Sequence, residues 1–232
     1  MNEPQKALIT TLYESYDNSP VIKGLIQALN VAGIPLGTMI DSSLGSIVTK
    51  IQIERLRTFF DELNRGNVVL DEAQIESNDF LHAYFETTAY VLRTRSNEKI
   101  ERFARILKKV YSGSLLVEDF EDYTKIFNDL TDKEFAILSI LYKHEQKHRL
   151  NPEKLPSYDL IDSYWKDFKT EIINSLHIKE TEINSYLVRL QRTGCFMRLN
   201  TDGIIILRPK PYPDEKGNTT ELFNTIMNLI KE

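Results

Sequence analysis

A short stretch near the middle of the chain carries the residue types of a zinc peptidase. Residues 144–148 read HEQKH, which matches the pattern H-E-x-x-H. On a helix, His144 and His148 would share one face and could both bind Zn²⁺, while Glu145 would act as base for a metal-bound water. Zinc-dependent hydrolysis also needs a third ligand, and Glu171 and His177 are the downstream candidates.

The surroundings of this pentapeptide argue against zinc chemistry. Lys143 and Arg149 flank it and Lys147 lies within it, and positive charges beside Zn²⁺ raise the electrostatic cost of binding the ion. Neither candidate third ligand stands at a recognised spacing from the motif. We therefore interpret HEQKH as the solvated polar end of a helix, where cations favour the dipole, and expect no catalytic residue, no metal ligand and no cofactor. A zinc hydrolase acting through HEQKH stays as the least favoured alternative.

Other side chains capable of chemistry are isolated. The chain has one cysteine, Cys195, so it cannot form an intrachain disulfide, and its apolar neighbours indicate a small buried hydrophobe. Trp165 stands in an aromatic stretch that is typical of a core, and His82 and His177 are expected to be structural. The sequence contains no glycine-rich phosphate loop, no G-x-S-x-G and no metal-spaced cysteines.

Composition favours an ordinary globular protein of the reducing cytosol. The chain has 232 residues, of which 41% are hydrophobic and 27% charged. Residues 1–130 hold 14 Lys/Arg and 19 Asp/Glu, and residues 131–232 hold 15 of each. Neither half is basic, which argues against a dedicated nucleic-acid binder. The first 20 residues lack the pattern of a signal peptide.

Residues 24–40 form a run of 17 residues without charge. A membrane-spanning helix needs about 20 strongly apolar residues, and this run contains Gln27, Asn30 and Pro35. We expect two short helices, over 20–32 and 36–50, packed as a buried hairpin. The alternative is a membrane-acting effector in which residues 21–49 leave the core and enter a bilayer or a partner.

Helical periodicity continues from residue 51 to residue 130. Helices are expected from 51 to a stop at residues 64–66, and over 78–94, 97–112 and 117–130, with Ser77 as an N-cap and Gly113 as a stop. The apolar stripe of the helix over 78–94 is predicted to be Leu81, Phe85, Thr88, Ala89 and Leu92, with Phe80 and Tyr84 beside it. The junction before residue 97 is the most basic part of the chain. Its candidate contacts with an anionic partner are Arg93, Arg95, Lys99, Arg102 and Lys109.

The last third predicts a winged-helix-like order of elements. Thr131 and Glu134 form a capping box that starts a helix ending near His148, and two further helices follow over 157–175 and from 179. Strands over 195–199 and 204–209 are expected to pair as a hairpin through a turn at 200–203, before a last helix over 219–231. The predicted contacts of this domain with DNA or a partner are Arg189, Arg192, Arg208 and Lys210. Glu180 and Glu182 at the start of the third helix would repel phosphates.

The stretch LRTRSNEK, Leu92 to Lys99, resembles the ARTRSEEK-like junction of a group of uncharacterised bacterial helical proteins. In that group a glycine-rich apolar segment precedes a pair of helices, and some members are suspected to act in defence against phage. The resemblance brings no catalytic residues. It implies a protein that works through contacts with other components.

These observations predict a mainly α protein of two domains. Residues 1–130 would form a helical domain with the apolar segment 21–49, and residues 131–232 a winged-helix-like domain with a small β-hairpin. The expected function is a non-enzymatic protein-interaction module of a bacterial cytoplasmic system, binding another protein or a second copy of itself. A membrane-acting effector, peripheral to the bilayer, and a DNA-binding regulator are the main alternatives.

Overall fold

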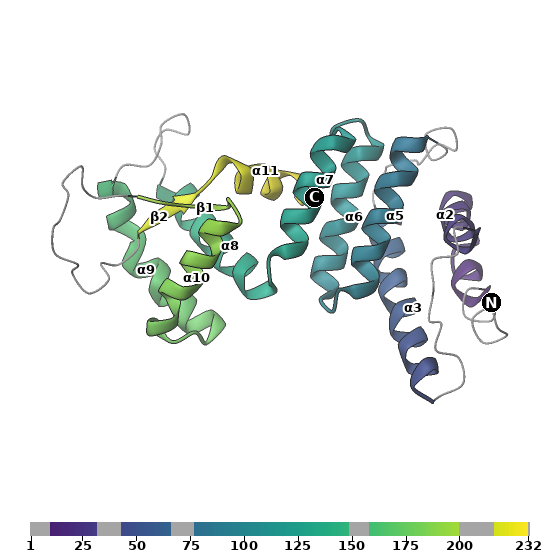
Figure 1. The fold of residues 1–232 in the computed structure, drawn as a ribbon, viewed down its shortest axis with the longest axis horizontal. Helices are drawn as coiled ribbons and strands as arrows, with labels where there is room; N and C mark the ends of the chain where they lie inside the picture. Colours follow the sequence, from purple (N-terminus) through teal and green to yellow (C-terminus); the bar gives the residue numbers. More distant parts are fainter. Residues whose placement is uncertain (1–9, 32–42, 66–76, 149–157, 200–215, 232) are drawn as a thin grey trace. The chain divides into compact units, whose positions relative to one another are not determined.

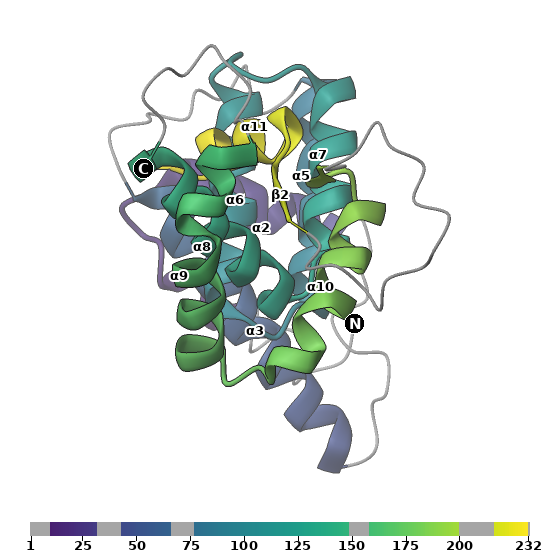
Figure 2. The ribbon, with the colours of Figure 1, turned by 90° about the vertical axis from the view of Figure 1, so that its left-hand side faces the viewer.

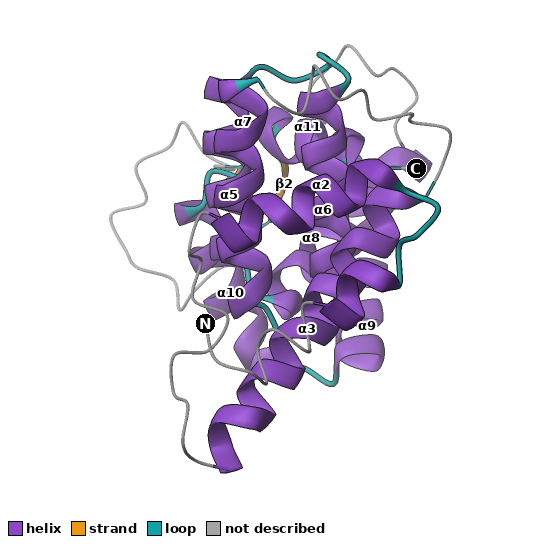
Figure 3. Cartoon of the chain, turned by 90° about the vertical axis from the view of Figure 1, so that its right-hand side faces the viewer, coloured by secondary structure: helices purple, strands orange, loops and turns teal. Residues whose placement is uncertain are grey.

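The computed structural model describes residues 10–31, 43–65, 77–148, 158–199 and 216–231. It is mainly α-helical with one small antiparallel pair of strands, as predicted (Figures 1 and 3). The chain divides into two compact units, here called unit 1 (Met1–Lys125 with Leu229–Glu232) and unit 2 (Ile126–Asn228). Within the described ranges no helix has both the length and the apolar character needed to cross a bilayer.

Unit 1 is built from helices whose ends follow local capping signals. They are α2 (Pro20–Val31), α3 (Ser43–Asn64), α5 (Asn78–Arg93), α6 (Asn97–Tyr111) and most of α7 (Val117–Asp129). The hydroxyl of Ser77 accepts a hydrogen bond from the Phe80 N–H at 3.2 Å, which confirms the predicted N-cap of α5. Gly113 follows α6 with a φ of 68°, the left-handed conformation that glycine adopts without strain.

The predicted break near residue 50 is wrong. One continuous helix, α3, spans both the end of the expected helix over 36–50 and the helix expected from residue 51. Residues 46–63 contain neither glycine nor proline, so nothing interrupts the backbone hydrogen bonding between the two expected segments. Residues 36–42 lie outside the described part of the chain.

The core of unit 1 forms where α3 packs against α5 and α6. On α6 the expected inward residues are buried, among them Ile100, Phe103 and Leu107. On α5 the predicted stripe is wrong by part of a turn, since the buried residues are Phe80, Ala83, Tyr84, Thr87, Thr88 and Val91. The hydroxyls of Thr87 and Thr88 donate to the carbonyl oxygens four residues earlier at 2.7 and 2.8 Å, which lets polar residues face the core.

Helix α2 contributes its apolar face to the same core. Ile22, Leu25, Ile26 and Leu29 are at most 2% exposed. The buried Tyr84 hydroxyl on α5 donates to the Leu25 carbonyl at 2.9 Å. The apolar face of α2 is therefore interior, as the buried-hairpin interpretation requires of its first helix.

Unit 2 contains α8 (Asp132–His148), α9 (Tyr158–Leu176), α10 (Glu180–Arg192), β1 (Phe196–Arg198), β2 (Gly217–Thr219) and nearly all of α11 (Glu221–Leu229), as Figure 2 shows. The predicted capping box at the start of α8 is confirmed. Glu134 accepts from the Thr131 N–H at 2.9 Å, and the Thr131 hydroxyl oxygen accepts from the Glu134 N–H at 3.2 Å. Cys195 and Trp165 are buried, as predicted, and burial raises the pKa of the Cys195 thiol.

The strand that pairs with β1 differs from the predicted one. β1 lies antiparallel to β2, with Met197 opposite Asn218, and residues 204–209 fall outside the described part of the chain. A Cβ on Gly217 would lie 2.3 Å from the Met197 carbonyl oxygen. The close approach of the β1 backbone therefore requires glycine at this position.

Candidate functional site

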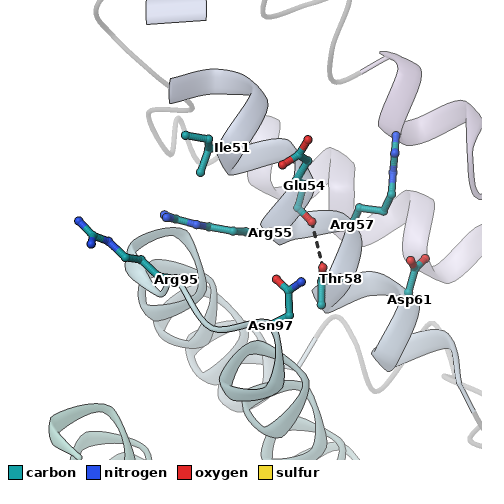
Figure 4. Close-up of a pocket in the computed structure, with 8 residues that line it drawn as sticks. All are labelled: Ile51, Glu54, Arg55, Arg57, Thr58, Asp61, Arg95 and Asn97. Carbon is teal, nitrogen blue, oxygen red and sulfur yellow. Dashed lines mark hydrogen bonds between the residues drawn. The ribbon is translucent and has the colours of Figure 1, made fainter. Parts of the chain in front are cut away.

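A cavity of about 400 Å³ opens on unit 1 between α3 and the junction of α5 with α6. We call it the arginine cavity. Its lining residues are Ile51, Glu54, Arg55, Arg57, Thr58, Asp61, Arg95 and Asn97, drawn in Figure 4. Two segments 40 residues apart along the sequence, around Arg55 and Arg95, thus contribute to one concave surface.

Arg55 and Arg95 bring two positive charges to the same side of this cavity (Figure 4). Arg55 donates to the carbonyl oxygen of Leu92 in the last turn of α5, which holds its guanidinium in place. Partial burial, and secondarily the positive charge of Arg95, lower the pKa of Arg55. An anion bound beside these two guanidinium groups would relieve their mutual repulsion.

The opposite wall of the arginine cavity carries carboxylates. Asp61 accepts a hydrogen bond from the Tyr16 hydroxyl at 2.7 Å, and burial, followed by this hydrogen bond, raises the pKa of Tyr16. Glu54 is exposed on α3, and its carbonyl oxygen accepts from the Thr58 hydroxyl at 3.2 Å. The cavity therefore has Arg55 and Arg95 on one side, and Asp61 on the other side together with Arg57 (Figure 4).

An exposed apolar edge adjoins the arginine cavity at Ile51. Ile47, Val48 and Ile51 are 52%, 46% and 39% exposed. They lie in the first turns of α3, which project past the ends of α5 and α6 (Figures 1 and 3). Several large apolar side chains exposed together on one helix are typical of a binding surface, whereas single exposed ones are common everywhere. We call these three residues the α3 apolar edge.

The predicted basic contacts do not form one patch. Arg93 ends α5, Arg95 lies in the linker, and both are exposed. Lys99 and Arg102 are half-buried on α6. Lys109 is at the other end of α6, about 15 Å from Lys99 at 1.5 Å per residue. Of the five, Arg95 is the one that lines the cavity.

The HEQKH stretch is more buried than predicted. Glu145 is only 6% exposed, and its carboxylate accepts from both the N–H, at 2.6 Å, and the hydroxyl of Thr219 on β2. His144 and His148 are half-buried and lie against the ring of Tyr164. The expectation of a solvated helix end is wrong here because α9 and β2 both pack on α8.

The two histidines of this stretch use ring nitrogens in contacts within unit 2. His144 Nε2 lies 2.9 Å from Glu171 Oε2, so the structure does bring one candidate third ligand to the motif. His148 donates through Nδ1 to the His144 carbonyl oxygen at 2.8 Å. His177 follows the end of α9 with a φ of 52°, a helix-terminating conformation. His144, through Glu171, links α8 to α9, and Glu145, through Thr219, links α8 to β2.

The predicted basic contacts of unit 2 are divided. Arg189 on α10 is bound to Glu134, with its Nε 2.9 Å from Oε1, and its guanidinium lies 5.0 Å from the centre of the Tyr186 ring. Arg192 is exposed at the end of α10. Arg208 and Lys210 lie outside the described residues. Of the two basic residues of α10, Arg189 is thus already paired with Glu134.

Sequence reasoning missed Arg55, Arg57 and the α3 apolar edge. Arg55 stands between Ile53 and Leu56 of the apolar stripe of α3. Nothing in the sequence around it indicates that Arg95 would come close. Of the three edge residues, Ile47 and Val48 had been assigned to a buried hairpin, and Ile51 to the helix expected from residue 51. No known protein family matches the chain, and no curated protein or solved structure matches it either.

Proposed function

We propose that this chain is a non-enzymatic protein-interaction module whose partner binds the α3 apolar edge and the arginine cavity together. The observation that carries the proposal is their continuity through Ile51, which belongs to both surfaces. A partner segment with apolar side chains and a neighbouring carboxylate would bury the first and pair with Arg55 and Arg95. As the resemblance at LRTRSNEK implies, the setting would be a bacterial cytoplasmic system, including phage defence.

The charges around the cavity favour a protein partner over an anionic membrane. A bilayer surface rich in acidic lipids would attract Arg95 but repel Glu54 and Asp61 on the other wall. A folded partner can place a carboxylate against the arginines and a cation against the acids. In addition, the apolar face of α2 lies in the core of unit 1, so residues 22–29 would have to leave the core before they could enter lipid.

The hydrogen bonds of Glu145 in HEQKH also support a non-enzymatic role. The carboxylate of Glu145 is buried and accepts two hydrogen bonds from Thr219. A general base must reach a substrate water, and this carboxylate would have to break both contacts to do so. In this proposal the motif has a structural role.

In unit 2, the order of α8, α9, α10, β1, β2 and α11 supports a winged-helix-like arrangement. We propose that it serves protein contact and not DNA readout. Glu180 and Glu182 begin α10, and Arg189 is engaged by Glu134. Titration of labelled duplex DNA at low salt tests the alternative, since binding that weakens on Arg192→Ala would favour a DNA-binding regulator.

The proposed surface can be tested by photo-crosslinking. A photoreactive amino acid at Ile47 should capture a specific partner in cells, identified by mass spectrometry, and the same residue at Leu116 provides the matched control. Leu116 directly precedes α7 in unit 1 and is 66% exposed, and among the described residues α7 itself carries no exposed large hydrophobic residue. A second copy of this chain as the captured species would assign self-association.

The captured partner is then purified and its affinity measured. We expect Ile47→Asp with Ile51→Asp, and separately Arg95→Glu, to weaken binding at least tenfold, and Leu116→Asp to leave it unchanged. Equal affinities for all variants would refute the proposal. Flotation of the purified chain with acidic vesicles, abolished by the same substitutions, would assign the surface to a membrane instead.

A further inference from the structure

Three side chains with metal-binding groups meet on unit 1, away from the arginine cavity. His82 and Glu86 lie one turn apart on α5, and Glu121 lies on α7. His82 Nε2 is 2.9 Å from Glu121 Oε1 and 4.0 Å from Glu86 Oε2. One ligand atom from each of the three residues lies within 4.8 Å of the others. No sequence motif marked this group, because Glu121 follows Glu86 by 35 residues.

The carboxylate of Glu86 is held as a metal ligand would be. Its Oε1 accepts a hydrogen bond from the Tyr90 hydroxyl at 3.3 Å, one turn further along α5. Its Oε2 is buried, and no residue in the described ranges donates a hydrogen bond to it. A buried carboxylate oxygen without a donor is costly, and a cation would satisfy it.

We propose that His82, Glu86 and Glu121 bind a divalent transition-metal ion, zinc foremost, that links α5 to α7. An imidazole with two carboxylates suits such ions better than Mg²⁺ or Ca²⁺, which prefer oxygen ligands alone. Ligand bonds of about 2.0–2.1 Å in a tetrahedron place ligand atoms roughly 3.3 Å apart. The observed separations of 2.9 and 4.0 Å fall on either side of that value. Three protein ligands leave a fourth position for water or for a group from a partner.

The role of Tyr90 makes the proposal specific. A group that orients a ligating carboxylate typically changes metal affinity about 10- to 100-fold when it is removed. Tyr90→Phe removes the hydroxyl and keeps the ring, which stacks on Phe103 with centroids 5.6 Å apart. We therefore expect zinc to bind at least tenfold more weakly to this variant although the fold is unchanged.

Isothermal titration of the metal-free full chain with ZnCl₂ tests the site, with MnCl₂ and MgCl₂ in parallel. We expect one zinc ion per chain, a higher melting temperature on zinc addition, and at least tenfold weaker binding after His82→Ala or Glu121→Gln. His177→Ala, a histidine in unit 2, should bind as the wild type does. Circular dichroism establishes that each variant is folded.

Two results would overturn the metal site. One is a wild-type chain that takes up no zinc, or takes up Mg²⁺ more tightly. The other is zinc affinity that survives His82→Ala and disappears in His148→Ala, which would assign the ion to HEQKH. Because the partner-binding proposal is measured with Ile47 and Arg95 variants, either proposal can fail while the other stands.

Discussion

Two helices of this molecule carry side chains that could bind another molecule, and they use them differently. On α8, Glu145 of HEQKH is buried and bound to Thr219, and the half-buried His144 is bound to Glu171. On α3 the apolar edge and the arginine cavity face outward. The helix with the recognisable motif uses those side chains in contacts within unit 2. The helix without a motif presents an exposed surface.

The difference shows that residue types and spacing do not reveal where the hydrogen bonds of a side chain go. Glu145 and Thr219 are 74 residues apart, and Glu145 becomes structural only because β2 packs on α8. Conversely, Ile47 was expected inside a hairpin and is exposed. Each of the following substitutions tests one side of this comparison.

The largest effect is expected at Glu145. Glu145→Ala removes the acceptor of the buried Thr219 N–H and one of the two acceptors of the Thr219 hydroxyl, the other being Asn224 Oδ1. A loss of this kind costs about 3 kcal/mol of unfolding free energy. Urea unfolding followed by circular dichroism measures it. Glu171→Ala is the matched control, because that side chain is 39% exposed and its contact with His144 is only part-buried; it should cost less than about 1 kcal/mol. Equal losses in the two variants would contradict the structural role of Glu145.

An intermediate effect is expected at Arg55, which belongs to both sides of the comparison. It lines the cavity and also donates to the Leu92 carbonyl at the end of α5. Arg55→Ala should lower the unfolding free energy by about 1.5 kcal/mol, the usual value for a hydrogen bond to a charged group. Arg57, an exposed arginine of the same helix, provides the control. Arg57→Ala should change the unfolding free energy by less than about 0.5 kcal/mol. Thermal unfolding of both variants decides whether Arg55 has this second, structural role.

Local signals allowed much of the fold to be predicted. Ser77, Gly113 and the Thr131–Glu134 capping box mark helix ends through contacts within a few residues, and all of them appear in the structure. The partner of β1 could not be predicted, because pairing with β2 spans about 20 residues and depends on a glycine that only the packed strands explain.

The candidate site was only partly predictable. Arg95 was named from the density of basic residues, but its neighbour Arg55 depends on how α3 packs beside α5. Buried threonines on α5 likewise shifted the predicted stripe, since hydroxyls that bond within the helix behave as apolar groups.

A smaller, pH-dependent effect is expected at Glu134. Burial acts to raise the pKa of this carboxyl, but hydrogen bonds from Thr131 and Arg189 outweigh it and lower the pKa below the ordinary value of 4.5. The ionised form therefore stabilises the fold at pH values above 4.5, and this contribution is lost as the pH falls through the lowered pKa. Glu134→Gln should be about 1 kcal/mol less stable than wild type at pH 7. The gap should close below pH 4.5 in urea titrations, and a gap that widens there would contradict the assignment.

The smallest effect on stability is expected at the open surface itself. Ile47→Asp and Arg95→Glu should each change the unfolding free energy by less than about 0.5 kcal/mol, because both side chains are exposed and no described residue pairs with Arg95. The same two substitutions should weaken binding of the partner at least tenfold. A side chain that is dispensable for folding and necessary for binding belongs to an interface. If Ile47→Asp instead destabilised the chain as much as Glu145→Ala, the start of α3 would belong to the core, and the contrast between the two helices would disappear.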